Sequence, residues 1–188
     1  MKKAIYVGKQ ALKSTSKRVE GSFISLDGDR FYKIKDFEEM DPFFMSLVSP
    51  SDHWLFIASN GGLTAGRVNA ESALFPYYTD DKIVDSAEHT GSKTLIQVNH
   101  GEKSYLWEPF SNYGRGLYNV ESNLYKNTHG NRLRFEQINR DLNLRFAQEW
   151  SFSDRFGILR QAWIENIGDE NCSIELIDGI QNILPSGV

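Results

Sequence analysis

Aromatic side chains in irregular segments are the strongest candidates for ligand chemistry in this sequence. Tyr77 and Tyr78 follow a proline, and Trp107 and Tyr113 lie in or beside a segment with turn signals. An exposed ring in a loop can stack on the C–H face of a sugar, because it has a flat apolar body. Rings that seal the edge of a folded sheet would have the same sequence pattern, and this structural interpretation is favoured. We retain Tyr77, Tyr78, Trp107 and Tyr113 as candidate substrate-binding residues.

A glycine-rich stretch, residues 60–67, invites interpretation as a phosphate-binding loop. It lacks the spacing and the adjacent lysine and hydroxyl residues of a P-loop, and no long helix is expected after it. A tight turn between two strands explains the glycines better. Arg67, the last residue of the stretch, is a candidate for contact with an anion, and we retain it as a further candidate substrate-binding residue.

Neighbouring carboxylates and the histidines define no catalytic or metal site. Glycosidic cleavage needs two carboxyl groups held roughly 5–10 Å apart across a sugar. The carboxylate pairs of this chain are explained by turns and helix starts: Asp27 with Asp29, Glu38 with Glu39, and Asp80 with Asp81. The histidines lack metal-ligand spacing, and a catalytic base at His100 is the weaker alternative to a residue in a turn. We assign no catalytic residue, no metal and no cofactor.

Composition argues against nucleic-acid and membrane partners. The chain has 21 Lys plus Arg and 25 Asp plus Glu, a net charge of -4, and the charges are dispersed. No apolar run approaches the roughly 20 residues of a membrane span, and the first one stops at Gly8, too short for an export signal. The single cysteine, Cys172, is typical of a structural thiol in a reducing compartment. We expect a soluble, cytoplasmic protein.

Turn signals and alternating apolar residues predict strands along most of the chain. Asp27-Gly28 predicts a hairpin between residues 21–26 and 31–35, and Gly101 predicts another between residues 91–100 and 103–107. Further strands are expected at residues 53–59, 117–125, 132–139, 142–152, 156–167 and 172–177. Short helical segments are expected from Asp36, which has capping-box spacing to Glu39, and from Thr79. Residues 109–116 are expected to form a loop.

The long strands of the second half indicate how these elements are layered. In residues 142–152, apolar side chains fall on one face and mostly polar ones on the other, as in an antiparallel strand with one wet face. Residues 156–167 are apolar on both faces, which predicts a central strand. The sequence therefore predicts an all-β fold, a two-layer antiparallel β-sandwich with one or two short helices, formed by residues 1–188 as one domain.

Several stretches of the chain resemble the start of cellobiose-phosphorylase-like proteins, a group of glycoside phosphorylases and hydrolases. They are residues 51–67, which contain Asn60-Gly61-Gly62, residues 73–82, the run Gln148-Glu149-Trp150, and residues 158–170. The similarity extends over about residues 21–185, and its motifs are strands and turns. It implies an N-terminal β-super-sandwich of the galactose-mutarotase-like type.

The resemblance also implies a domain that is inactive alone. In this group the sandwich precedes a helical (α/α)6 barrel, where an aspartic acid protonates the leaving oxygen while phosphate attacks the anomeric carbon. Residues 1–188 show no run of long amphipathic helices, so the barrel is expected as a missing C-terminal partner and no catalytic residue is carried over. The implied roles are to shape the cleft for an oligosaccharide, such as a β-linked cello-oligosaccharide, and to form a homodimer.

Two other functions stay open at this point. A free-standing carbohydrate-binding module would use the loop aromatics to line a groove. A mutarotase-like sugar epimerase would need a histidine and a carboxylate that converge in one cleft. The domain hypothesis instead predicts an exposed apolar surface where the barrel docks, because obligate interfaces resemble a core cut in half.

Overall fold

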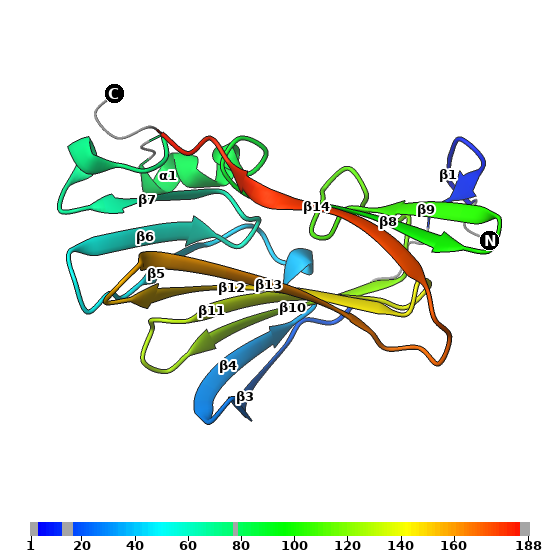
Figure 1. Cartoon of the computed structure of the whole chain (residues 1–188), viewed down its shortest axis with the longest axis horizontal. Coiled ribbons are helices and arrows are strands. Elements are labelled where there is room, and N and C mark those ends of the chain that lie inside the picture. The colour runs from blue at the N-terminus through cyan, green and yellow to red at the C-terminus, as the bar shows by residue number, and fades with distance from the viewer. Residues whose placement is uncertain (1–3, 13–16, 77–78, 185–188) are drawn as a thin grey trace.

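The computed structural model describes residues 4–12, 17–76 and 79–184, and most of them lie in antiparallel strands (Figure 1). The largest sheet has six strands in the order β13-β12-β11-β10-β4-β3. Its members are β3 (Glu20–Leu26), β4 (Asp29–Lys35), β10 (Val120–Asn127), β11 (Leu133–Asn139), β12 (Leu144–Ser153) and β13 (Gly157–Asn166). This sheet positions most of the polar side chains discussed below.

Two smaller sheets have three strands each. One has the order β14-β8-β9 and consists of β8 (Gly91–His100), β9 (Lys103–Trp107) and β14 (Ser173–Gln181). The other has the order β5-β6-β7 and consists of β5 (Phe44–Leu47), β6 (His53–Ala58) and β7 (Leu63–Arg67). A short hairpin joins β1 (Tyr6–Val7) to β2 (Gln10–Ala11). The helical segments are η1 (Phe37–Glu39), η2 (Ala70–Ser72), α1 (Asp80–Ile83) and η3 (Val84–Ser86). No helix in the described part of the chain is long and apolar enough to cross a membrane.

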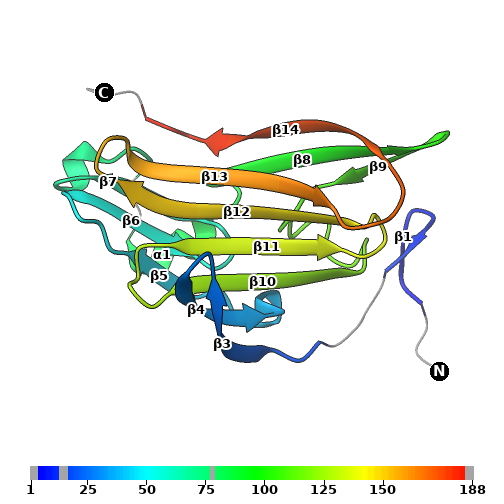
Figure 2. The same cartoon turned by 60° about the horizontal axis from the view of Figure 1, so that its bottom comes forward.

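The two small sheets lie over the same face of the six-stranded sheet, as two views of the chain show (Figures 1 and 2). Leu55 and Ile57 of β6 belong to one core cluster with Trp150 of β12. Ile96 of β8 belongs to a second cluster with Phe146 of β12. Burial of these apolar side chains holds the sheets face to face. The prediction of an all-β fold with short helices is confirmed, and the sheets pack in a sandwich-like arrangement.

Local turn chemistry explains the first hairpin. Asp27 and Gly28 have φ angles of 53° and 84°, the left-handed conformations that a two-residue type I′ turn requires. The turn pairs Leu26 with Asp29 and so sets the register of β3 on β4. The hairpin between β8 and β9 also forms as predicted, with Gly101 at a φ of 58°.

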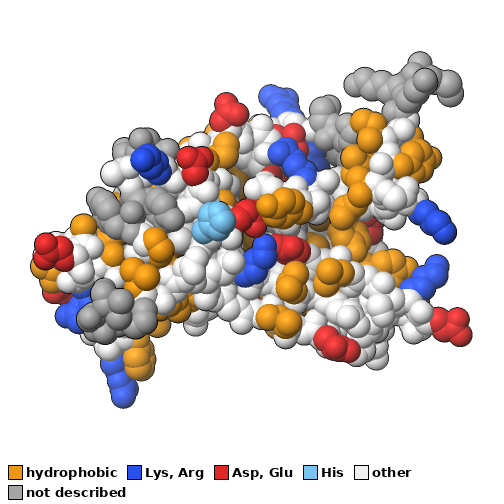
Figure 3. Space-filling model, turned by 90° about the horizontal axis from the view of Figure 1, so that it is seen from above, with side chains coloured by type: hydrophobic (Ala, Val, Ile, Leu, Met, Phe, Trp, Pro, Cys, Tyr) orange, Lys and Arg blue, Asp and Glu red, His pale blue; other side chains and the backbone are white. Residues whose placement is uncertain are grey.

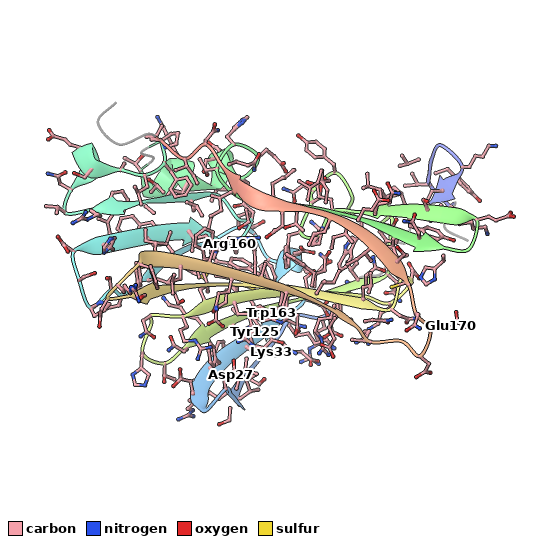
Figure 4. All side chains as sticks on the ribbon, in the orientation of Figure 1. Asp27, Lys33, Tyr125, Arg160, Trp163 and Glu170 are labelled. Atoms are coloured by element: carbon pink, nitrogen blue, oxygen red, sulfur yellow. The ribbon has the colours of Figure 1, made fainter. Side chains whose placement is uncertain are left out.

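The outer face of β12 is less wet than its sequence pattern suggests. Glu149 is 3% exposed and accepts hydrogen bonds from Nε of Arg132 and Nε of Arg134, both at 2.8 Å. Arg134 also stacks on the Trp163 ring and donates to Asp27, and this hydrogen bond lowers the pKa of the Asp27 carboxyl. Asp27 and Trp163 are labelled on this side of the sheet in Figure 4. Charged side chains therefore cover a face predicted to meet solvent, because paired charges tolerate burial.

Three local predictions are wrong. Residues 156–167 were expected to form a central strand, but β13 is the edge strand of its sheet, and its apolar inner side chains pack under β14 and β8. Residues 63–67 form strand β7 instead of part of a turn. Asp36 makes no side-chain cap at η1, because its backbone is left-handed with a φ of 52°.

The glycine-rich stretch serves close packing in the described structure. A Cβ at Gly62 would lie 2.2 Å from the carbonyl oxygen of Ile83, so the turn before β7 touches α1 directly. A Cβ at Gly66 would lie 2.5 Å from the Trp54 ring and 2.7 Å from the carbonyl oxygen of Ser72. These contacts explain why small residues are required at positions 62 and 66.

We predict that Gly66→Ala lowers the free energy of unfolding by about 1–3 kcal/mol, because the new methyl group overfills a closed contact. Gly179→Ala is the matched control, since Gly179 also lies in a strand and its added Cβ would meet nothing within 4 Å. Urea denaturation of both variants measures the difference. Equal stabilities for the two variants would contradict this role for Gly66.

Candidate functional site

A concave pocket of about 300 Å³ is lined by residues of both packed layers. It opens between η1, the turn at Asn60, the end of β9 and residues 108–117, and Gln137 of β11 lies at its base. We call it the Glu38 pocket. Apolar and aromatic side chains form much of its wall: Phe37, Met40, Leu106, Trp107, Phe110, Tyr113, Leu117 and Tyr118. Such a mixture is typical of pockets for small organic ligands.

Four side chains form a hydrogen-bonded base in this pocket. The Gln137 carbonyl oxygen accepts from Nε1 of Trp107 at 3.1 Å and from the backbone N–H of Phe110 at 3.3 Å. These two donors fix the orientation of the amide, so its nitrogen donates to Oγ of Ser122 at 3.0 Å and to Oε1 of Glu38 at 3.3 Å. Ser122 in turn donates to Oε2 of Glu38 at 2.8 Å. The carboxylate is therefore held in one position.

Glu38 combines this fixed geometry with an altered acidity. Burial raises the pKa of its carboxyl, although the hydrogen bond from Ser122 and the positive charges of Arg115 and Lys17 act in the opposite direction. The side chain thus takes up a proton at a higher pH than an ordinary glutamate. A carboxyl group of this kind can accept a hydrogen bond from a ligand hydroxyl, or donate one after it is protonated.

Arg115 connects the loop that lines the pocket, residues 108–117, to η1. Its guanidinium donates to the backbone carbonyl oxygen of Glu38 at 3.0 Å and forms an ion pair with Glu39 at 3.3 Å. Two residues earlier in the same loop, Tyr113 is 80% exposed at the rim. Leu106 and Met40, which also line the pocket, are 63% and 41% exposed. The pocket therefore has a polar base and an apolar, solvent-exposed rim.

The structure brings together two of the five candidate substrate-binding residues. Trp107 and Tyr113 both line the Glu38 pocket, but Trp107 is 2% exposed, so its ring is part of the core and its N–H orients Gln137. Arg67 is the last residue of β7 and lies opposite His53 of β6. It does not line the pocket. Tyr77 and Tyr78 lie outside the described residues.

Glu38, Gln137 and Arg115 were not predicted as site residues. Glu38 was interpreted with Glu39 as part of a helix start. Gln137 carried a signal, because it follows Leu133 and Phe135 at the spacing that points side chains to one face of a strand. Gln137 is buried and Glu38 is half-buried, whereas Arg115 is exposed in the loop. A polar residue such as Gln137 on an apolar face indicates a specific partner.

A second pocket of about 240 Å³ contains one of the histidines. It is lined by His100 at the end of β8 and by Asp169 and Glu170 in the turn after β13, together with Leu142, Asn143, Asn166 and Gly168. Glu170 is labelled at this end of the molecule in Figure 4. A histidine and two carboxylates thus share one concave site. In the part of the chain that the structure describes, no group of three or more His, Cys, Asp or Glu side chains is arranged to hold a metal ion.

Comparison with known proteins identifies no relative: no family model matches the sequence, and no match is found among curated proteins.

Proposed function

We propose that this chain is a carbohydrate-binding, non-catalytic domain of a carbohydrate-active enzyme, in which the Glu38 pocket receives a sugar unit. By its resemblance to cellobiose-phosphorylase-like proteins, the fold is a β-super-sandwich of the galactose-mutarotase-like type, and the parent enzyme is a cytoplasmic glycoside phosphorylase. The observation that carries the proposal is the pocket itself, where an oriented carboxylate and amide lie beneath an apolar rim that includes the exposed ring of Tyr113.

The chemistry of the pocket suits a sugar better than a purely apolar ligand. A pyranose presents hydroxyl groups at its edge and C–H groups on its faces. Glu38 offers acceptors for hydroxyl groups, and Tyr113 offers an exposed ring against which a sugar face can stack. The volume of about 300 Å³ lies at the lower end of the range for small-molecule sites, which supports one sugar unit and not a long oligosaccharide.

The exposed rim supports a role within a larger assembly. Leu106, Tyr113 and Met40 present apolar surface beside the pocket, as the domain hypothesis requires for docking of a helical catalytic domain. Small-molecule sites often lie at domain interfaces. On this proposal the rim is covered by the catalytic domain, and the sugar is bound between the two.

Calorimetric titration with glucose, cellobiose and longer cello-oligosaccharides tests the sugar site. We expect binding that Glu38→Gln weakens by about tenfold, because loss of a hydrogen bond to a charged group costs about 1.5 kcal/mol or more. Tyr113→Ala is expected to weaken it by a smaller factor through loss of stacking. Phe156→Ala is the matched control, since Phe156 is 67% exposed and does not line the pocket. Absence of binding, or equal effects of all three substitutions, would overturn the proposal.

The pocket that contains His100 favours a second candidate, a mutarotase-like sugar epimerase. A histidine and carboxylates at one site supply the acid and base that ring opening of a sugar requires. Polarimetry of freshly dissolved glucose tests this activity directly. Acceleration that His100→Ala abolishes and Glu38→Gln leaves unchanged would establish the epimerase, whereas no acceleration by the unmodified chain would exclude it.

A further inference from the structure

One charged side chain in the wall of the Glu38 pocket is not neutralised. The charged residues of this wall are Glu38, Glu108 and Arg115. Glu108 forms an ion pair with Lys93, and Arg115 forms one with Glu39. Glu38 has no ion-pair partner in the part of the chain that the structure describes, and its carboxylate accepts hydrogen bonds from two neutral side chains. Since a carboxylate withdrawn from solvent is normally paired with a cation, a cation is expected from a ligand.

The hydrogen bonds at the base of the pocket leave acceptors for a ligand. Nε1 of Trp107 and the backbone N–H of Phe110 both donate to the Gln137 carbonyl oxygen. The two amide protons of Gln137 and the hydroxyl proton of Ser122 are also used within the base. A carboxylate has about four lone-pair sites, and these bonds occupy two of those of Glu38. A ligand group that only donates hydrogen bonds therefore fits the base.

The polar groups elsewhere in the wall do not select an anion. The Arg115 guanidinium donates to the backbone of Glu38 and pairs with Glu39. The Tyr118 hydroxyl donates to the backbone carbonyl oxygen of Leu106 at 2.8 Å. Oγ of Ser111 is buried without a hydrogen-bond partner among the described residues, and a hydroxyl oxygen can accept from a ligand as well as donate. The wall thus provides acceptors but no free cation cluster.

The wider surface also favours a cation over an anion. The chain has a net charge of -4. Among the described side chains of the face seen from above, acidic and basic groups are interspersed and form no broad basic patch (Figure 3). The exposed ring of Tyr113 at the rim adds a favourable contact, because the face of an aromatic ring attracts a cation.

We propose that the sugar unit bound in the Glu38 pocket carries a protonated primary amine, and that this ammonium group pairs with the Glu38 carboxylate. An ammonium group has three donors and no acceptor, which matches a base that still offers acceptors. A sugar hydroxyl brings one donor and no charge, and an acidic sugar would place a second anion beside the first. The inference rests on the proposed function, because it specifies the class of sugar.

The acidity of Glu38 supports this pairing. The charged groups that act on its carboxyl are Arg115 of the loop, Lys17 of the segment before β3, and Glu39 of η1. Burial outweighs the two cations and raises the pKa of Glu38. A bound ammonium group would favour the ionised carboxylate and lower that pKa again. An amino sugar would therefore bind to a carboxylate that the protein alone does not fully stabilise.

Calorimetric titration with glucosamine, glucose and glucuronate at pH 6.5 tests the inference. These sugars differ in one substituent that is cationic, neutral or anionic. We expect glucosamine to bind about tenfold more tightly than glucose, as a charged hydrogen bond typically provides, and glucuronate to bind most weakly. The preference for glucosamine should disappear at pH 9.5, where an amine with a pKa of about 8 is neutral.

Two variants separate direct pairing from a general charge effect. Glu38→Gln keeps the shape of the side chain and should reduce the preference for glucosamine to within about twofold, because the ion pair is lost. Glu39→Gln is the matched control, since it removes the same charge one residue away and Glu39 does not line the pocket. A preference that survives Glu38→Gln, or that Glu39→Gln also removes, overturns the pairing.

The ligand series also distinguishes failure of this inference from failure of the proposed function. Equal binding of glucose and glucosamine would overturn the amino-sugar inference and leave the sugar site standing. Cyclohexylamine, which has an apolar ring and an ammonium group but no hydroxyl groups, should bind more weakly than glucosamine. If it bound as tightly while glucose did not bind, the ammonium site would stand and the sugar would be wrong. No binding by any of these ligands would overturn both.

Discussion

Arg160→Met is expected to lower the free energy of unfolding by about 3 kcal/mol, the lower end of the range for breaking a buried ion pair. The Arg160 side chain is 7% exposed and joins the two layers (Figure 4). Its Nε donates to Oγ of Ser92 at 2.6 Å and to Oε1 of Gln148 at 3.1 Å, while its terminal nitrogens bind Asp178. Methionine keeps much of the volume but removes all of the Arg160 donors, so that, of the bonds to Asp178 that the structure describes, only the one from Thr94 remains.

The destabilisation by Arg160→Met should depend on pH. Partial burial acts to raise the pKa of Asp178, but hydrogen bonds from Arg160 and Thr94 outweigh it, so the net pKa is below its ordinary value. A carboxyl group whose pKa is lowered by folding stabilises the folded state at pH values above its pKa in the unfolded chain, about 3.9. This stabilisation is lost as the pH falls through the pKa of the group in the folded state. The difference between the original chain and the variant should therefore shrink below about pH 4.

Urea denaturation at pH 7 and at pH 3 measures both effects. Arg145→Met is the matched control, because Arg145 is 35% exposed on the outer face, where it pairs at 2.7 Å with the exposed Glu165 and more loosely, at 3.6 Å, with Glu136. An exposed pair contributes about 0–1 kcal/mol. If Arg160→Met were no more destabilising than Arg145→Met, the link between β13 and β14 would be dispensable for the fold.

Short-range features of this fold are predictable from sequence. Asp27-Gly28 requires left-handed backbone at two successive residues, and a type I′ turn supplies it, so the hairpin of β3 and β4 was predicted correctly. The hairpin of β8 and β9 was predicted to the residue, because Gly101 separates two strongly patterned segments. In both cases the determining interactions span only a few residues.

Long-range order is not predictable in the same way. Strand β4 pairs with β10 across about ninety residues, and no turn signal records that pairing. Apolar residues on both faces of β13 were interpreted as the mark of a central strand, but β13 is an edge strand. The opposite layer covers its inner face, and Arg134 stacks on Trp163 of its outer face. Sequence periodicity reports burial of a face, and it does not report which element covers that face.

The candidate site shows the same limit. Trp107 and Tyr113 were chosen because aromatic rings in or near loops can stack on a sugar. Both line the Glu38 pocket. Glu38 and Gln137 meet there although 99 residues separate them in sequence. Their roles arise from a contact between η1 and the inner face of β11, so their types and local spacing alone could not have identified them.

Phe110→Ala is expected to destabilise the fold by about 3 kcal/mol, the lower end of the range for removal of a core phenylalanine. Phe110 packs against both core clusters, with its ring centroid 6.0 Å from Phe135 in one and 6.2 Å from Phe146 in the other. Its backbone N–H also donates to Gln137 at the base of the Glu38 pocket. The substitution should therefore loosen the contact between the layers and the pocket together.

The left-handed backbone conformation of Phe110 also predicts the order of stability of two variants. Its φ of 63° is left-handed, a conformation that costs roughly 1–2 kcal/mol for a residue with a Cβ and little for glycine. Phe110→Gly should therefore be more stable than Phe110→Ala by about 1 kcal/mol, the reverse of the usual order in regular structure. Thermal and urea denaturation of both variants, with exposed Phe156→Ala as control, measure the order. If the alanine variant were the more stable one, the left-handed backbone at residue 110 would carry no energetic cost, and this explanation would be wrong.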